Sequence, residues 1–275
     1  MYDIYTGILK MMGTFCNDDE NISVKYILNK NRTSLCEKYH IDKIAGECSD
    51  FEKAINILVW LSAHTWHKGD YDSSYDDALS LLDYSFDKKE HGISCAALSM
   101  ILSQCLLALD IKSRVLTLIL FSPYDIDRHV VCEVYADSLG KWVMLDPTFG
   151  TYVMNENNTP LSVSEIRTYL ADRKQILFFK KTHYNGDELS EKVITEYYAK
   201  DMFIIEFQEI QGCLSEKSRM ISIVSIGYDL KKRSSVNSDY VIKNFGEIEW
   251  IVTKLKKIEK DENYNVVYKD ISILD

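Results

Sequence analysis

Three residues in the middle of the chain have side chains that together could catalyse acyl transfer: Cys95, His129 and Asp146. A thiol becomes a strong nucleophile when it ionises, and a neighbouring imidazolium favours the thiolate. A carboxylate beside the imidazole would fix its orientation and tautomer. Any one of the seven cysteines is more often a small buried hydrophobe. The prediction therefore depends on the elements that position these three residues.

Cys95 begins an apolar segment, residues 94–109, that predicts a central helix covered on most sides. Unpaired N–H groups and the helix dipole favour an anion there, but by at most about 2 kcal/mol, so the helix lowers the pKa of a thiol by about one unit. Stronger activation needs an imidazolium such as His129. The N–H of Cys95 could also donate to an oxyanion, and Gly92 would let a substrate approach the backbone. Asp110 is expected to end the helix with a positive φ.

A predicted β-hairpin, residues 129–136 and 141–147, supplies the imidazole and the carboxylate. A tight two-residue turn at 137–138 would pair His129 directly with Asp146. Facing residues share one face of a sheet, with Cβ atoms about 4.5–5.5 Å apart. A register slip of one residue would place the two side chains on opposite faces, so the turn decides the prediction.

Several motifs of this stretch, over about residues 90–175, resemble the core of the transglutaminase-like superfamily, in a bacterial-type member. They are Gly92-Ile-Ser-Cys95, His129-x-x-x-Glu133-Val-Tyr and Lys141-Trp142-x-x-Leu-Asp146-Pro-Thr. The resemblance implies an α+β fold with a papain-like core, in which a central helix packs against an antiparallel sheet. It further implies that Cys95 is the nucleophile, that His129 acts as general base and then acid, and that Asp146 fixes the imidazole. Asp110 departs from the superfamily pattern, which usually has Gly there.

A second strong helix is predicted upstream, beginning at Asp50 and ending at Gly69. Its end carries Trp66 and His67, where the resemblance continues. Either side chain is a candidate for the second oxyanion donor, Trp66 through its indole N–H. Downstream, residues 162–165 form a capping box that starts another helix.

The chain is predicted to have two parts. Residues 1–175 form a transglutaminase-like catalytic domain with an N-terminal helical lead-in. Residues 176–275 form a strand-rich α/β extension of unknown role, which could belong to the same domain. Within this extension, strands are predicted at 176–179, 202–210, 220–228 and 240–242, and a helix at 246–258.

The charge and cysteine content bound the setting. A formal net charge of −10 argues against a general nucleic-acid binder, which needs a basic face. The N-terminus lacks the pattern of a secretory signal, and no apolar stretch approaches the ~18 residues of a membrane span. No CxxC pair is present, and Cys105 and Cys132 are expected in the core. We expect a cytoplasmic protein with free thiols, no cofactor or metal, and no nucleic-acid or membrane partner.

These observations favour an enzyme that acts on peptide or amide carbonyls through a thioester. Water as acceptor would make it a protease or amidase, which we favour; an amine acceptor would make it a protein-glutamine transglutaminase or an amide ligase. A second hypothesis is a non-catalytic peptide-binding module on the same fold, which a blocked cleft over Cys95 would favour. A third is a metalloprotein that uses His64, His67 and His91. The substrate and the oligomeric state stay open.

Overall fold

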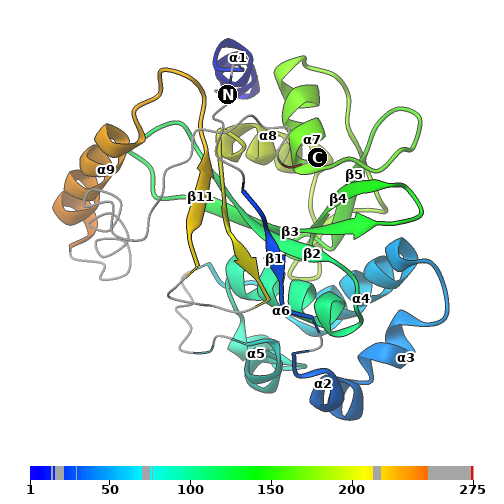
Figure 1. The fold of residues 1–275 in the computed structure, drawn as a ribbon. Coiled ribbons are helices and arrows are strands. Elements are labelled where there is room, and N and C mark those ends of the chain that lie inside the picture. Colours follow the sequence, from blue (N-terminus) through cyan, green and yellow to red (C-terminus); the bar gives the residue numbers. More distant parts are fainter. Residues whose placement is uncertain are drawn as a thin grey trace.

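The computed structural model describes residues 1–13, 15, 22–28, 30–69, 75, 77–212, 218–246 and 274. Within them, seven strands form one antiparallel sheet in the order β11-β9-β2-β3-β4-β5-β6 (Figure 1). The strands are β2 (Ser113–Ile119), β3 (Arg128–Ala136), β4 (Lys141–Asp146), β5 (Thr151–Met154), β6 (Leu177–Phe178), β9 (Ile204–Gln208) and β11 (Met220–Ile223). With the helices on both sides of the sheet, the chain has an α+β fold.

The helices divide between the two faces of the sheet (Figure 1). One face packs against α6 (Cys95–Ala108), with α2 (Arg32–Tyr39), α3 (Ile41–Ala45), α4 (Asp50–His64) and α5 (Ala78–Ser85) around it. The other face packs against α1 (Tyr2–Met11), α7 (Val163–Ala171) and α8 (Glu191–Asp201). Further elements are β1 (Lys25–Tyr26), the 3-10 turn Lys89–His91, β7 (His183–Tyr184), β8 (Asp187–Glu188), β10 (Ile210–Gln211) and α9 (Leu230–Phe245).

The central position predicted for residues 94–109 is what the structure has. Nearly every side chain of α6 beyond its first turn is buried. Its buried hydroxyls are paired: Ser99 donates to the carbonyl of Val130 at 2.9 Å, and the hydroxyls of Ser103 and Ser113 lie 3.0 Å apart. Asp110 follows with a φ of +63°, as expected. Because its polar groups are satisfied by the sheet, α6 can occupy the centre of the molecule.

The hairpin of β3 and β4 closes with a longer turn than predicted. Tyr135 pairs with Trp142, across a four-residue turn that ends at Gly140 with a φ of +65°. The predicted two-residue turn would have paired Tyr135 with Gly140, so the predicted register is wrong by two residues. Side chains alternate with a period of two, so a shift of two keeps His129 and Asp146 on one face. The predicted register is therefore wrong, but the prediction that His129 and Asp146 share one face of the sheet is correct.

A buried ion pair lies behind the hairpin. Nη2 and Nε of Arg114 lie 2.6 and 2.8 Å from the same carboxylate oxygen of Glu133. The other carboxylate oxygen accepts a 2.7 Å hydrogen bond from the N–H of Val163, at the start of α7. The guanidinium also stacks on Trp142, 4.0 Å from the ring centroid. The Glu133 and Trp142 of the motifs therefore tie the hairpin to β2 and α7.

Helix α4 differs from the prediction at both ends. Ser49, rather than Asp50, is its N-cap, in a capping box with Glu52. The helix ends at His64, rather than at Gly69, because the backbone of Thr65 is extended. The hydroxyl of Thr65 donates to the carbonyl of Leu61 in the last turn of the helix. The chain then runs beside residue 93, with which it exchanges backbone hydrogen bonds of 2.8 and 2.9 Å. His64 and His67 therefore do not share a helical face.

The segment after residue 176 joins the same sheet, because β9 pairs with β2 and β11 pairs with β9. The strand predicted at 240–242 is wrong, since these residues lie in α9. Asp229 caps that helix, and a stripe with helical spacing is buried: Leu230, Ser234, Asn237 and Val241. The helix predicted at 246–258 falls almost wholly outside the described residues. The boundary near 175 stays a prediction.

None of the helices in the described ranges is long and apolar enough to cross a membrane. The five cysteines that the structure describes are free thiols, at positions 36, 48, 95, 105 and 132. Cys105 and Cys132 are buried in the core between the sheet and α6, as predicted. Burial raises the pKa of both thiols, to about 12 for Cys105. These two thiols are therefore protonated and inert at neutral pH.

Candidate active site

Cys95 is the first residue of α6, which places its thiol at the positive end of the helix dipole. Ser94 is the N-cap, and its side chain and carbonyl accept from the N–H groups of Ala97 and Leu98. The N–H groups of Cys95 and Ala96 have no hydrogen-bond partner within the described part of the chain. The helix therefore offers two unused donors beside the sulfur.

Gly92 has a different role from the one expected from the sequence. A Cβ at this position would lie 2.9 Å from Cβ of Lys68 and 3.3 Å from the carbonyl oxygen of Trp66. The glycine is therefore required by the close approach of the 66–68 segment, rather than by a substrate. This approach brings His67 to the start of α6.

The structure brings His129 and Asp146 into direct contact. Nε2 of His129 lies 2.6 Å from Oδ2 of Asp146, and both side chains are buried. The other carboxylate oxygen accepts from the N–H groups of Thr148 and Phe149, at 2.9 and 3.3 Å. The hydroxyl of Tyr198, on α8, donates to Oδ2 at 2.7 Å. Four contacts thus fix the carboxylate, and through it the orientation of the imidazole.

The same imidazole lies close enough to the thiol of Cys95 for each group to shift the pKa of the other. Burial alone would raise the pKa of this thiol, but hydrogen bonds from His129 and His67, together with their charge, outweigh burial and lower it to about 6. Burial likewise lowers the pKa of His129, yet the charge and hydrogen bond of Asp146, and then Cys95, raise it to about 10. At neutral pH the pair is therefore a thiolate beside an imidazolium.

His67 lines the same cleft as the thiol. Its Nδ1 lies 2.8 Å from the hydroxyl of Tyr184, in the β7–β8 hairpin. Asn185 of the same hairpin accepts from the backbone N–H of His67 at 2.7 Å and donates to its carbonyl at 3.0 Å. Because Tyr184 occupies Nδ1, Nε2 is the nitrogen of His67 that is left for a further hydrogen bond. Of the two predicted oxyanion donors, the structure thus brings His67 to the sulfur; Trp66 does not line the cleft.

A cleft of about 920 Å³ opens over these groups. Cys95, His67 and His129 line it, together with aromatic and aliphatic side chains from three other segments: Phe149, Tyr184, Leu189, Val193, Ile194 and Tyr197. Three aromatic rings surround the imidazole of His129, with centroids 5.2 to 6.1 Å away: Phe149, Tyr197 and Tyr198. The cleft is large enough for a segment of peptide, and the rings restrict water around the imidazole.

One edge of the cleft is acidic but locally neutralised. Asp125 and Asp127, in the β2–β3 loop, each lie 2.9 Å from Nζ of Lys200. Asp201 is buried beside them, and its carboxyl oxygens have no hydrogen-bond partner among the described residues. Burial, then the charge of Asp127, raises the pKa of Asp201 to about 8, so it is mostly protonated at neutral pH.

The histidines of the predicted metal site already have hydrogen-bond partners in the protein. His64 lies 2.7 Å from Asp87, and Nδ1 of His91 lies 2.8 Å from the carbonyl of Tyr84. Among the described residues, no group of three or more His, Cys, Asp or Glu side chains is placed to hold a metal ion. The three histidines of that hypothesis therefore do not form a common site.

Sequence analysis missed α8 and the β7–β8 hairpin, which bring Tyr198 and Tyr184 to the site. A signal for α8 exists, since Ile194, Tyr198 and Asp201 lie at helical spacing and are buried. The mixture of β-branched and aromatic residues hides this spacing. Nothing in the sequence around Tyr184 indicates its contact with His67, which joins residues 117 positions apart.

Comparison with known proteins finds little overall similarity. No known protein-family profile matches the chain, and no curated protein matches it. A solved structure from Cytophaga hutchinsonii, described as a "putative cysteine protease", aligns with 19% identity and a TM-score of 0.34. The alignment covers 44% of this chain and 39% of that one. The function proposed below therefore rests on the geometry of the site.

Proposed function

We propose that this chain is a cysteine-nucleophile acyl-transfer enzyme with a papain-like core, and that it hydrolyses peptide or amide bonds through a thioester on Cys95. The observation that carries the proposal is the placement of the Cys95 thiol, at a helix N-terminus, in one cleft with an imidazole that Asp146 holds through a 2.6 Å hydrogen bond. The transglutaminase-like motifs occur at these same residues. Nucleophile, base and orienting carboxylate in this order form the arrangement of a catalytic triad.

Each group then has a definite task. The thiolate of Cys95 attacks the carbonyl carbon, and the negative charge moves to the carbonyl oxygen. The N–H of Cys95 and Nε2–H of His67 donate to that oxyanion. His129 gives its proton to the departing amine, which leaves a thioester. His129 next takes a proton from water, and the hydroxide attacks the thioester. The intermediate then expels the thiolate of Cys95 with formation of the acid, which restores the thiolate beside the protonated His129.

The neighbouring groups keep the triad in place. The carboxylate of Asp146 accepts hydrogen bonds from the imidazole of His129 and from the hydroxyl of Tyr198, so Tyr198 helps to hold the imidazole through Asp146. Tyr184 holds the ring of His67 through its Nδ1. Since the cleft above Cys95 is open, a peptide can reach the sulfur, which supports turnover over a non-catalytic binding role.

The direct test uses a panel of fluorogenic peptide amides, with and without added alkyl amines, and mass spectrometry of the products. We expect hydrolysis by the wild type and loss of at least about a hundredfold in Cys95→Ala. Cys48→Ala is the matched control, because Cys48 is a half-buried free thiol in the loop between α3 and α4 and should keep full activity. Amine-coupled products in place of acids would establish transfer as the reaction.

If none of the peptides is cleaved, a labelling experiment shows whether the peptides are the wrong substrates or the thiol is not activated. Sub-stoichiometric iodoacetamide at neutral pH should modify Cys95 ahead of the other cysteines, because its pKa is lowered to about 6. Equal modification of Cys95 and Cys48 in the folded protein would refute the proposed nucleophile.

A further inference from the structure

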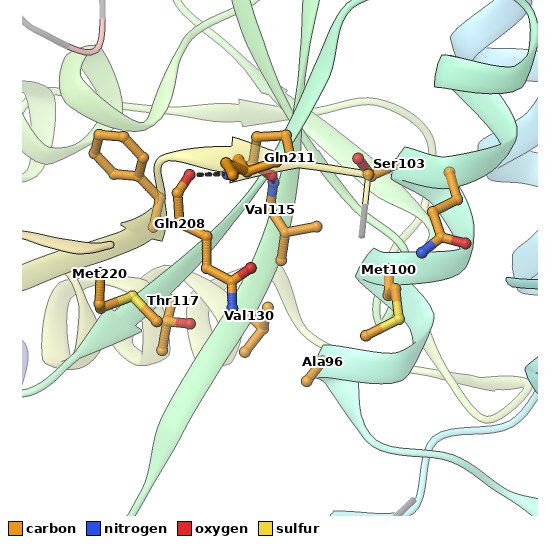
Figure 2. Close-up of a pocket in the computed structure, with 13 residues that line it drawn as sticks. Ala96, Met100, Ser103, Val115, Thr117, Val130, Gln208, Gln211 and Met220 are labelled. Atoms are coloured by element: carbon orange, nitrogen blue, oxygen red, sulfur yellow. Dashed lines mark hydrogen bonds between the residues drawn. The ribbon is translucent and has the colours of Figure 1, made fainter. Parts of the chain in front are cut away.

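A second cavity of about 180 Å³ lies between α6 and the sheet, next to the cleft. In Figure 2, Met100 on α6 faces Val115 and Val130 on β2 and β3 across this space, with Met220 on its far side. Phe207 of β9 also lines it. The walls are thus mostly aliphatic, with flexible methionine side chains on two sides.

This pocket adjoins the cleft over the thiol, because the two cavities share lining residues. Ala96, Thr117 and Val130 line both cavities. Ala96 follows Cys95 directly in the sequence, and Met100 is one helical turn farther along the same face. The pocket therefore lies along the side of α6 that begins next to the nucleophile.

The polar side chains around the pocket are mostly committed to other partners. The amide of Gln211 accepts from the N–H of Val115 at 2.9 Å and donates to the carbonyl of Gln208 at 2.7 Å (Figure 2). Ser103 is paired with Ser113, and Oε1 of Gln104 accepts from the N–H of Ala78. A polar guest would find few free partners there, whereas an apolar guest would displace water at little polar cost.

Several side chains that line the pocket are more exposed than their neighbours on the same helix and strand. Along α6, Ala96 is exposed and Met100 half-buried, although nearly every other side chain of the helix is buried. Val115 and Thr117 are the half-buried members of β2, and they face the same space. Apolar surface left open beside a reactive group is typical of a substrate subsite.

We propose that this pocket is a specificity site that binds one apolar side chain of the substrate, between leucine and phenylalanine in size. The inference rests on the proposed function and names the substrate class of that site. A cavity of about 150 Å³ holds benzene, so 180 Å³ suits a single side chain and not a longer segment. The peptide backbone itself would lie in the larger cleft.

The test uses N-acetyl dipeptide chloromethyl ketones, which alkylate an activated thiol without requiring turnover. One series varies the residue next to the ketone, and a second series varies the residue before it, among glycine, aspartate, leucine and phenylalanine. The second-order rate constant for modification of Cys95 is followed by mass spectrometry. In one of the two series, we expect the leucine or phenylalanine probe to react at least about tenfold faster than the glycine and aspartate probes.

Two variants assign that preference to the pocket. Val115→Phe fills the cavity and should reduce the leucine-to-glycine rate ratio to about two or less, whereas Met100→Ala enlarges it and should move the preference toward phenylalanine. Ile4→Phe is the control, because Ile4 is exposed on α1 and should leave the ratio unchanged. Thermal melting of each variant verifies that it is folded.

The outcomes distinguish this inference from the proposed function. If Cys95 reacts readily but shows no side-chain preference, or keeps its preference in folded Val115→Phe and Met100→Ala, the pocket is not the specificity site and the nucleophile stands. If neither the ketones nor iodoacetamide modify Cys95 selectively, the proposed function fails and the subsite falls with it.

Discussion

Tyr198, on α8, donates a 2.7 Å hydrogen bond to the same oxygen of Asp146 that contacts the imidazole of His129. Tyr198 and Asp146 are 52 positions apart in the sequence, and both are buried. A carboxylate that bridges a phenol and an imidazole has less freedom than one that bonds the imidazole alone. Tyr198 is therefore a positioning residue that acts through Asp146.

Replacing Tyr198 by Phe removes this hydrogen bond and keeps the ring packing. We expect kcat to fall about tenfold with KM nearly unchanged, because the substrate does not touch the hydroxyl. Loss of a hydrogen bond to a charged group should also cost about 1.5–3 kcal/mol of unfolding free energy. Tyr169→Phe is the matched control, since the Tyr169 hydroxyl makes no hydrogen bond within the described residues. A rise in KM with full kcat would assign Tyr198 to substrate binding.

The coupled thiol and imidazole predict a specific pH dependence of alkylation. A lowered thiol pKa means that Cys95 is ionised above about pH 6, and a raised imidazole pKa means that His129 stays protonated up to about pH 10. The rate of iodoacetamide modification should therefore rise through about pH 6 and stay level to about pH 10. In His129→Gln the midpoint should move upward, because burial is then opposed mainly by His67. A wild-type midpoint near the ordinary cysteine value would contradict the ion pair.

Variants of His67 test the second oxyanion donor. His67→Ala should lower kcat about 10²–10³-fold, the usual effect of removing one such donor. His67→Gln restores an N–H donor and should recover most of that loss. Trp66→Phe removes the competing indole N–H and should leave kcat close to that of the wild type, because Trp66 does not line the cleft. If Trp66→Phe lowered kcat strongly and His67→Ala did not, Trp66 would be the second oxyanion donor.

The parts of the site that local patterns specify were predictable from the sequence. The helix that starts at Cys95 was readable because it is apolar on nearly all sides. The strands that carry His129 and Asp146 were readable because they are short runs rich in apolar residues, which the structure buries on both faces. The turn between those strands was not, since a four-residue turn and a two-residue turn differ little in composition here. The error did not separate the two side chains, because a sheet repeats every two residues.

Contacts between distant segments could not be read in the same way. The chain leaves α4 at Thr65 because it pairs with the residues before Cys95, and a propensity argument does not see that partner. Tyr184 and Tyr198 reach the site through tertiary packing of elements whose own patterns are weak. Charge and aromatic content alone did not distinguish them from the other tyrosines.

The ion pair of Arg114 and Glu133 should matter more for stability than the ion pairs on the surface. Its two side chains are 2% and 0% exposed, so Glu133→Gln leaves a buried guanidinium without its counter-charge. We expect a loss of about 3–5 kcal/mol of unfolding free energy, measured by urea denaturation. Glu188→Gln is the control, because Glu188 pairs with Lys181 at the surface and should change stability by less than about 1 kcal/mol. Similar small losses in both variants would mean that stacking on Trp142, rather than the buried charge pair, anchors Arg114.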